Sequence, residues 1–82
     1  MAMQHRVQMV GRRMKHLADA ANARKIRCEY LHLRANEMVK VGNPEQAEAY
    51  VHRLNLHKSV LMGLMKELEE CSAVLRSYDT TA

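Results

Sequence analysis

The chain has 82 residues, enough for one small domain whose single core would be marginal. Leu, Met, Ala, Glu, Lys and Arg are frequent, Phe and Trp are absent, and only three Tyr occur, a composition that favours helices over strands. The net charge is +4, two cysteines are too few for a disulfide framework, and neither a leader-like segment nor a run of about 20 apolar residues is present. We therefore expect an all-α protein, located in the cytoplasm, with reduced thiols.

The first predicted element is a helix over about residues 3–41. Apolar and small side chains recur in it at alternating intervals of four and three, a heptad pattern typical of helices that pack lengthwise against another helix. The recurring positions, with Arg24 as the one charged member, are Met3, Val7, Val10, Met14, Leu17, Ala21, Arg24, Cys28, Leu31, Ala35 and Met38. Residues 1–40 also carry nine Lys or Arg against three Asp or Glu, so this helix is strongly basic.

A turn is predicted next, at residues 42–44. Gly42 favours the end of a helix, Asn43 is a good helix cap, and Pro44 is favoured at the first position of a following helix. No other proline interrupts the chain. The sequence therefore predicts one sharp reversal of direction between two long helices.

The second predicted helix covers about residues 44–77, and a polar tail at 78–82 is expected to fray. The heptad pattern continues in it at Ala47, Tyr50, Leu54, His57, Leu61, Leu64, Leu68, Cys71, Leu75 and Tyr78. Folding the chain at the turn and pairing residues whose numbers sum to 85 brings the two heptad series face to face. The leucines predicted in this seam are Leu17, Leu31, Leu54, Leu61, Leu64, Leu68 and Leu75.

We therefore expect residues 1–82 to form a single antiparallel two-helix hairpin, similar to a coiled coil. A further set of apolar side chains is expected to form a stripe beside the seam that two helices cannot cover. Together with Ala18, its members are Ile26, Val39, Val51, Val60, Met62, Met65 and Val74. Exposed contiguous apolar surface indicates a binding partner, and flexible methionines suit such a surface. The predicted partner is another helical protein, or a second copy of the chain in a four-helix bundle.

Candidate chemistry is sparse. The register sets Cys28 against His57, with His32 one turn further, and these three could converge as ligands of a soft metal, but a fourth ligand is missing. The alternative is that His57 is a buried polar residue that specifies the register of the helices. Arg24 is expected to extend outwards to solvent with its stem packed on Leu61. We predict no metal, no cofactor and no enzyme activity, because no catalytic spacing or phosphate-binding glycine loop is present.

Nucleic-acid binding is an alternative function. The first helix offers a basic surface, comprising Arg6, Arg12, Arg13, Lys15, Arg24, Lys25 and Arg27. Aromatic residues on which bases could stack are scarce, and no helix-turn-helix spacing is present. In this alternative the chain is a homodimeric four-helix bundle of the phage or plasmid regulatory type.

The layout also resembles a known family, the small helical-hairpin co-chaperones of bacterial type III secretion systems. The resemblance rests on the turn Gly42-Asn43-Pro44-Glu45-Gln46 and on the leucine series of the second helix, and it covers most of the chain. It implies a hairpin that joins a helical chaperone of the TPR type and keeps the secreted needle subunit unpolymerised in the cytoplasm. The strong basicity of the first helix is not matched by that family.

Overall fold

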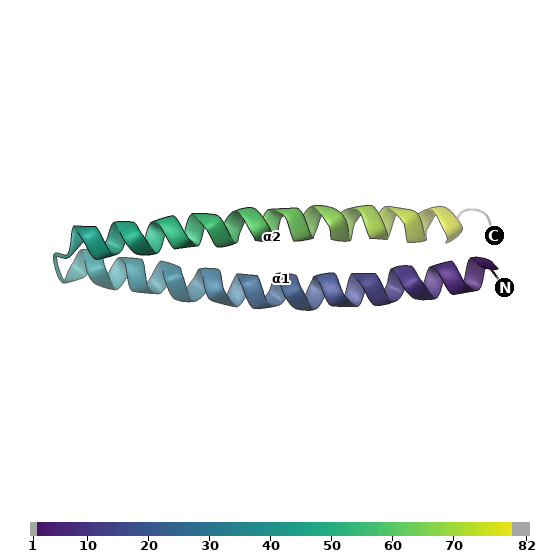
Figure 1. Ribbon diagram of the computed structural model, residues 1–82, viewed down its shortest axis with the longest axis horizontal. Helices are drawn as coiled ribbons and strands as arrows, with labels where there is room; N and C mark the ends of the chain where they lie inside the picture. Colours follow the sequence, from purple (N-terminus) through teal and green to yellow (C-terminus); the bar gives the residue numbers. More distant parts are fainter. Residues whose placement is uncertain (1, 80–82) are drawn as a thin grey trace.

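The computed structural model describes the backbone of residues 2–79 and the side chains of residues 4–78. Within this part of the chain there are two helices and no strand, α1 (Ala2–Lys40) and α2 (Pro44–Asp79). They lie side by side and run in opposite directions, so that the start of α1 and the end of α2 are at the same end of the hairpin (Figure 1). The molecule measures 61 × 16 × 14 Å. The predicted all-α hairpin is therefore confirmed.

The first helix ends at Lys40, one residue earlier than predicted. The reason is the hydrogen bonding of the turn: the amide of Gly42 donates to the carbonyl of Val39 at 3.1 Å, and the amide of Asn43 donates to that of Met38 at 2.8 Å. This pair of bonds is the Schellman ending of a helix, and it requires a left-handed residue. Gly42 supplies it, with a φ of 74°.

The same turn starts the second helix. The side-chain oxygen of Asn43 accepts a hydrogen bond from the amide of Gln46 at 3.3 Å, which makes Asn43 the cap of α2. Pro44 occupies the first helical position, where its missing amide hydrogen is not needed. Glu45 places a carboxylate in the first turn, near the positive end of the helix dipole.

The prediction of a frayed tail at 78–82 is wrong for residues 78 and 79. Tyr78 and the backbone of Asp79 belong to α2, which runs two residues beyond the predicted end at 77. Tyr78 is half-buried at a seam position, and the hydroxyl of Ser77 donates to the carbonyl of Val74 at 2.6 Å. The helix therefore continues through the seam position of Tyr78. Residues 80–82 lie outside the described part.

The best-packed part of the core lies in the half of the hairpin next to the turn. Leu31 is only 1% exposed and packs with Cys28 and Leu54, and Tyr50 covers this cluster. Leu31 and Leu54 are a pair in the predicted register. In the half near the chain ends Leu17 is buried, but the seam leucines of α2 (Leu61, Leu64, Leu68 and Leu75) remain only half-buried.

The hairpin exposes more surface than a compact protein of its size. Its accessible surface is 6607 Å². A compact monomer of 9.5 kDa exposes about 5,000 Å². The difference arises because two helices can bury only one side of each other, which leaves both sides of the seam open to a further chain.

Candidate protein-binding faces

The seam divides the surface of the hairpin into two flanks. One side of the seam carries the residue that follows every second seam position, such as Ala18 after Leu17. The opposite side carries the residue that precedes each of the other seam positions, such as Arg13 before Met14. We call the first side the lysine flank; it comprises Ala18, Lys25, His32 and Val39 of α1 with Val51, Lys58 and Met65 of α2. We call the second side the arginine flank; it comprises Arg13, Ala20, Arg27 and Arg34 of α1 with Arg53, Val60, Glu67 and Val74 of α2.

Two neighbouring hollows form a groove along the lysine flank. The first, of about 320 Å³, is lined by Ala21, Asn22, Lys25, Leu61, Met65 and Leu68. The second, of about 220 Å³ and nearer to the turn, is lined by Cys28, Glu29, His32, Leu54 and Lys58. The floor of the groove is made of seam side chains, and lysines stand at its edges. No carboxylate of the described residues lies within ion-pair distance of either Lys25 or Lys58.

Near the turn, arginine side chains of the arginine flank stack on the rings of tyrosines. The guanidinium of Arg34 lies 5.5 Å from the centre of the Tyr50 ring, and that of Arg53 lies 5.9 Å from the same ring. Arg34 also donates to the Tyr50 hydroxyl at 3.4 Å and to the carboxylate of Glu37 at 2.6 Å. The Tyr50 hydroxyl, with a smaller contribution from Glu37, raises the pKa of Arg34 above its ordinary value, so this side chain stays a cation.

Sequence reasoning missed the role of Arg34. Its side chain crosses the seam instead of extending into solvent, since its guanidinium reaches the Tyr50 hydroxyl of α2. Its Nε is buried without a hydrogen-bond partner among the described residues. A signal was present in the register, because the numbers of Arg34 and Tyr50 sum to 84 and the two residues are therefore neighbours across the seam. A second stacked pair lies nearby, since the Arg27 guanidinium is 5.5 Å from the centre of the Tyr30 ring.

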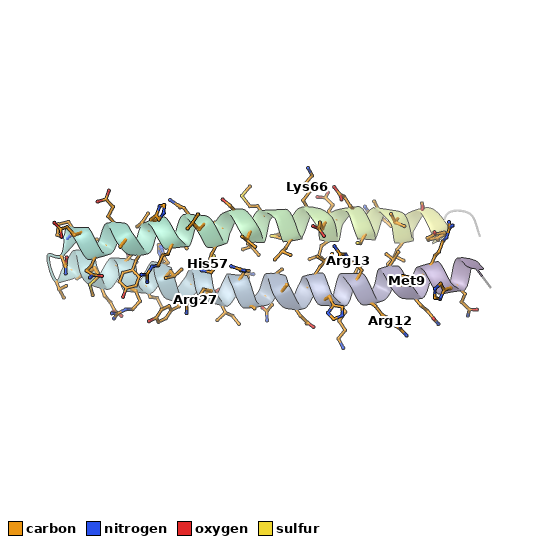
Figure 2. The ribbon with its side chains drawn as sticks, in the orientation of Figure 1. Met9, Arg12, Arg13, Arg27, His57 and Lys66 are labelled. Carbon is orange, nitrogen blue, oxygen red and sulfur yellow. The ribbon has the colours of Figure 1, made fainter. Side chains whose placement is uncertain are left out.

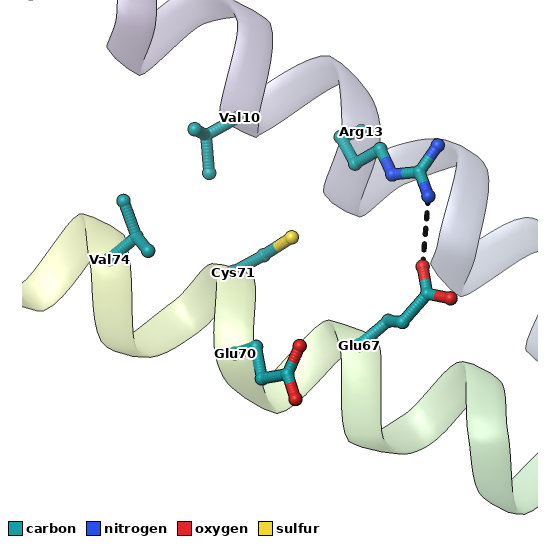
Figure 3. Close-up of a pocket in the computed structure, with 6 residues that line it drawn as sticks. All are labelled: Val10, Arg13, Glu67, Glu70, Cys71 and Val74. Atoms are coloured by element: carbon teal, nitrogen blue, oxygen red, sulfur yellow. Dashed lines mark hydrogen bonds and ion pairs between the residues drawn. The ribbon is translucent and has the colours of Figure 1, made fainter.

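Toward the chain ends, the arginine flank carries an ion pair beside a shallow hollow. Arg13 donates to the carboxylate of Glu67 at 2.9 Å, which links the two helices (Figure 3). The hollow of about 410 Å³ beside this pair is lined by Val10, Arg13, Glu67, Glu70, Cys71 and Val74. Both partners of the ion pair are well exposed, so solvent screening leaves it only a small effect on stability.

The predicted outward course of Arg24 is wrong. Its Nη1 lies 2.7 Å from Nδ1 of His57, in the half-buried seam. Figure 2 shows His57 directed from α2 toward α1, whereas Arg12 and Lys66 point away from the seam. The arginine can only donate, so His57 accepts through Nδ1 and carries its proton on the other ring nitrogen. Burial explains the difference, because a guanidinium in the seam needs an acceptor and the imidazole is one helical turn away.

The Arg24 and His57 pair yields a stability prediction. Changing His57 to leucine removes the acceptor and is expected to lower the free energy of unfolding by about 1 kcal/mol. Changing both residues to leucine is expected to raise it above the wild-type value by about 1 kcal/mol, because packed apolar side chains replace a partly buried polar pair. Urea unfolding of the three variants, including Arg24→Leu alone, measures both effects. A double variant whose loss is the sum of the losses in the two single variants would contradict the assigned contact.

The metal alternative is also corrected. His57 faces Arg24, and His32 lies in a different contact, with its Nε2 3.4 Å from the amide nitrogen of Asn36. Cys28 is buried against the core. The structure therefore does not bring Cys28, His32 and His57 together, and no group of three or more metal-binding side chains occurs within the described residues.

The residues predicted to bind a partner are all exposed, namely Ile26, Val39, Val51, Val60, Met62, Met65 and Val74. They do not form one stripe, which corrects the sequence interpretation. Val39, Val51 and Met65 lie on the lysine flank with Met62 at its outer edge, Val60 and Val74 lie on the arginine flank, and Ile26 lies on the outer side of α1. The reason is helical rotation of about 100° per residue, which sends positions just before and just after a seam residue to opposite sides.

Comparison with known protein families, with curated proteins and with solved structures found no match to this chain. Within the described residues, neither helix contains an apolar segment that is long enough to cross a membrane.

Proposed function

We propose that this chain is a protein-binding hairpin, not an enzyme, whose lysine flank receives an amphipathic helix of another protein. The supporting observation is the groove in which the seam leucines stay half-buried. Leu61 and Leu68 line it, and Met65, 58% exposed, stands at its edge. A third helix laid along this groove would complete the burial that two helices leave unfinished.

The chemistry of the groove describes the helix that fits it. Its floor is apolar, so the partner helix needs large aliphatic side chains at heptad spacing. Lys25 and Lys58 have no carboxylate partner among the described residues, so glutamates beside those aliphatic residues would pair with them. Met62 and Met65 have flexible side chains that adapt to the shape of the inserted helix.

The resemblance to secretion co-chaperones makes one version of this function more concrete. In that version the chain acts in the cytoplasm, joins a helical chaperone of the TPR type, and helps to keep a needle subunit unpolymerised. A hairpin with an uncovered groove suits this task, because a polymerising helical protein also presents an apolar helix face that must be covered.

Met65 provides a test of the groove. Changing Met65 to glutamate is expected to weaken binding of a synthetic helix with leucine heptads and glutamate edges by about tenfold or more, because a carboxylate would be buried without a partner. The matched control is Met9→Glu, since Met9 is equally exposed, 57%, but lies away from the lysine flank. Fluorescence anisotropy with the labelled peptide measures both affinities.

A peptide with lysine edges serves as the specificity control and is expected to bind less tightly than the glutamate version. Equal affinity of both peptides, or equal effects of the two methionine substitutions, would contradict the proposed groove. Co-expression with a TPR-type helical chaperone and a needle subunit of a type III secretion system tests the co-chaperone version separately. A soluble complex of all three chains is the expected result, and a needle subunit that polymerises equally with and without this chain would refute it.

A further inference from the structure

The arginine flank contains a pair of like charges that face each other. Arg13 of α1 and Glu67 of α2 meet across the seam at 2.9 Å. Moving 14 residues along each helix toward the turn, which is a whole number of heptads, leads to Arg27 and Arg53. By the same register these two arginines face each other, and neither has a carboxylate within ion-pair distance among the described residues.

Arg27 and Arg53 are held in place although no carboxylate of the described residues neutralises them, whereas Arg34 is paired with Glu37. Arg27 stacks on Tyr30, and Arg53 stacks on Tyr50 together with Arg34. Stacking fixes a guanidinium while leaving its hydrogen-bond donors free for another group. Like charges at facing positions destabilise a helix pair unless a counter-charge lies over them. Arg27 and Arg53 can therefore bind a carboxylate, and the described residues of the hairpin supply none to them.

The same flank carries carboxylates at its other end. Glu67 and Glu70 both line the hollow beside Arg13 and are exposed (Figure 3). Glu70 has no ion-pair partner among the described residues, and Glu67 has one oxygen bonded to Arg13. The flank thus has a positive end near the turn and available carboxylates near the chain ends.

We propose that the arginine flank binds a second copy of this chain. Along α2, Arg53 lies seven residues before Val60 and Glu67 lies seven residues after it. Consider a two-fold axis that crosses the flank at the level of Val60, perpendicular to the long axis of the hairpin. Rotation about this axis turns the second hairpin end over end, and it therefore places Arg53 of each copy against Glu67 and Glu70 of the other. Each contact occurs twice, as symmetry requires.

The middle of the flank suits a close approach of two hairpins. Ala20 faces Val60 there, since this pair lies one heptad from Arg13 and Glu67. Ala23 and Gly63, both small, lie beside them, and a methyl group added to Gly63 would meet no atom within 4 Å, so the surface is open at this point. A face of 61 × 16 Å is large enough to bury the roughly 800 Å² per partner that stable dimers use.

The direction of the second copy follows from the charges. If the two hairpins packed with their turns at the same end, Arg27, Arg34 and Arg53 of both copies would gather in one place. The end-over-end arrangement instead brings Arg53 of each copy to the carboxylates of the other. It also sets Arg27 against Arg13 of the other copy, whose charge Glu67 already neutralises. The antiparallel dimer is therefore the one favoured by charge complementarity.

Sedimentation equilibrium on the full chain tests the proposal. We expect the wild type to have twice the mass of 9.5 kDa. Arg53→Glu and Glu70→Arg are each expected to weaken dimerisation by about tenfold, because two symmetric contacts become repulsive. The double variant carries both changes in one chain, restores opposite charges across the interface, and is expected to recover most of the affinity.

Two controls separate this interface from other effects. Lys58→Glu makes the same charge reversal on the lysine flank and is expected to leave the dimer intact. Circular dichroism of each variant checks that the helices form, as expected for changes at exposed positions. A monomeric wild type, or a double variant no better than the single ones, would overturn the proposal. So would a monomer that binds single-stranded RNA with a steep salt dependence, because nucleic acid would then be the ligand of the arginines.

Discussion

Changing Leu31 to alanine is expected to lower the free energy of unfolding by about 3 kcal/mol. Leu31 is the most deeply buried large side chain among the described residues, and its removal leaves a cavity beside Cys28 and Leu54. A core of this size seldom contributes more than about 3–5 kcal/mol. The variant is therefore expected to be largely unfolded at room temperature. Urea unfolding followed by circular dichroism, at a fixed protein concentration, measures the change.

The matched control for this prediction is Leu33→Ala. Leu33 belongs to the same helix but is 61% exposed, so the same chemical change removes almost no packing. Its effect is expected to stay within about 0.5 kcal/mol. If both substitutions lowered the free energy of unfolding equally, the loss would not come from the core around Leu31, and helix propensity would not explain it either, because alanine is the better helix former. The position of the core in the half near the turn would then be wrong.

The second large effect is expected at the turn. Gly42 has a φ of 74°, and a β-branched residue is strained in that region. Changing Gly42 to valine is expected to lower the free energy of unfolding by about 2 kcal/mol. Asparagine tolerates this backbone conformation better, so Gly42→Asn is the control and is expected to lose clearly less. Thermal unfolding of the two variants ranks them.

The size of the Gly42→Val effect separates backbone strain from a packing effect. A methyl group built on Gly42 meets no atom within 4 Å, so crowding by neighbours does not contribute. Equal losses for valine and asparagine would contradict the strain explanation. Chain entropy would not explain such losses, because replacing glycine reduces the entropy of the unfolded chain and thereby favours folding.

The arrangement of the two helices was predictable because its causes are local. The heptad spacing identifies the residues that face the other helix, and Gly42, Asn43 and Pro44 act on their own backbone and on their nearest neighbours. The same local rules misplaced only the ends. The amide of Val41 still donates to the carbonyl of Glu37 at 3.0 Å, but the helix ends before Val41 because the Schellman bonds of the turn follow it. Tyr78 was assigned to a polar tail although it continues the seam.

The sequence by itself therefore determined the hairpin, its turn, its register and the seam leucines. The tertiary structure decided which flank each exposed side chain occupies and where the long polar side chains go. Arg24 reaches one turn along the seam to His57, and Arg34 crosses to Tyr50. A register gives the position of each Cα atom along the helix, whereas a guanidinium has several rotatable bonds and binds whichever acceptor lies within its reach. Contacts of that kind become defined only when both helices are in place.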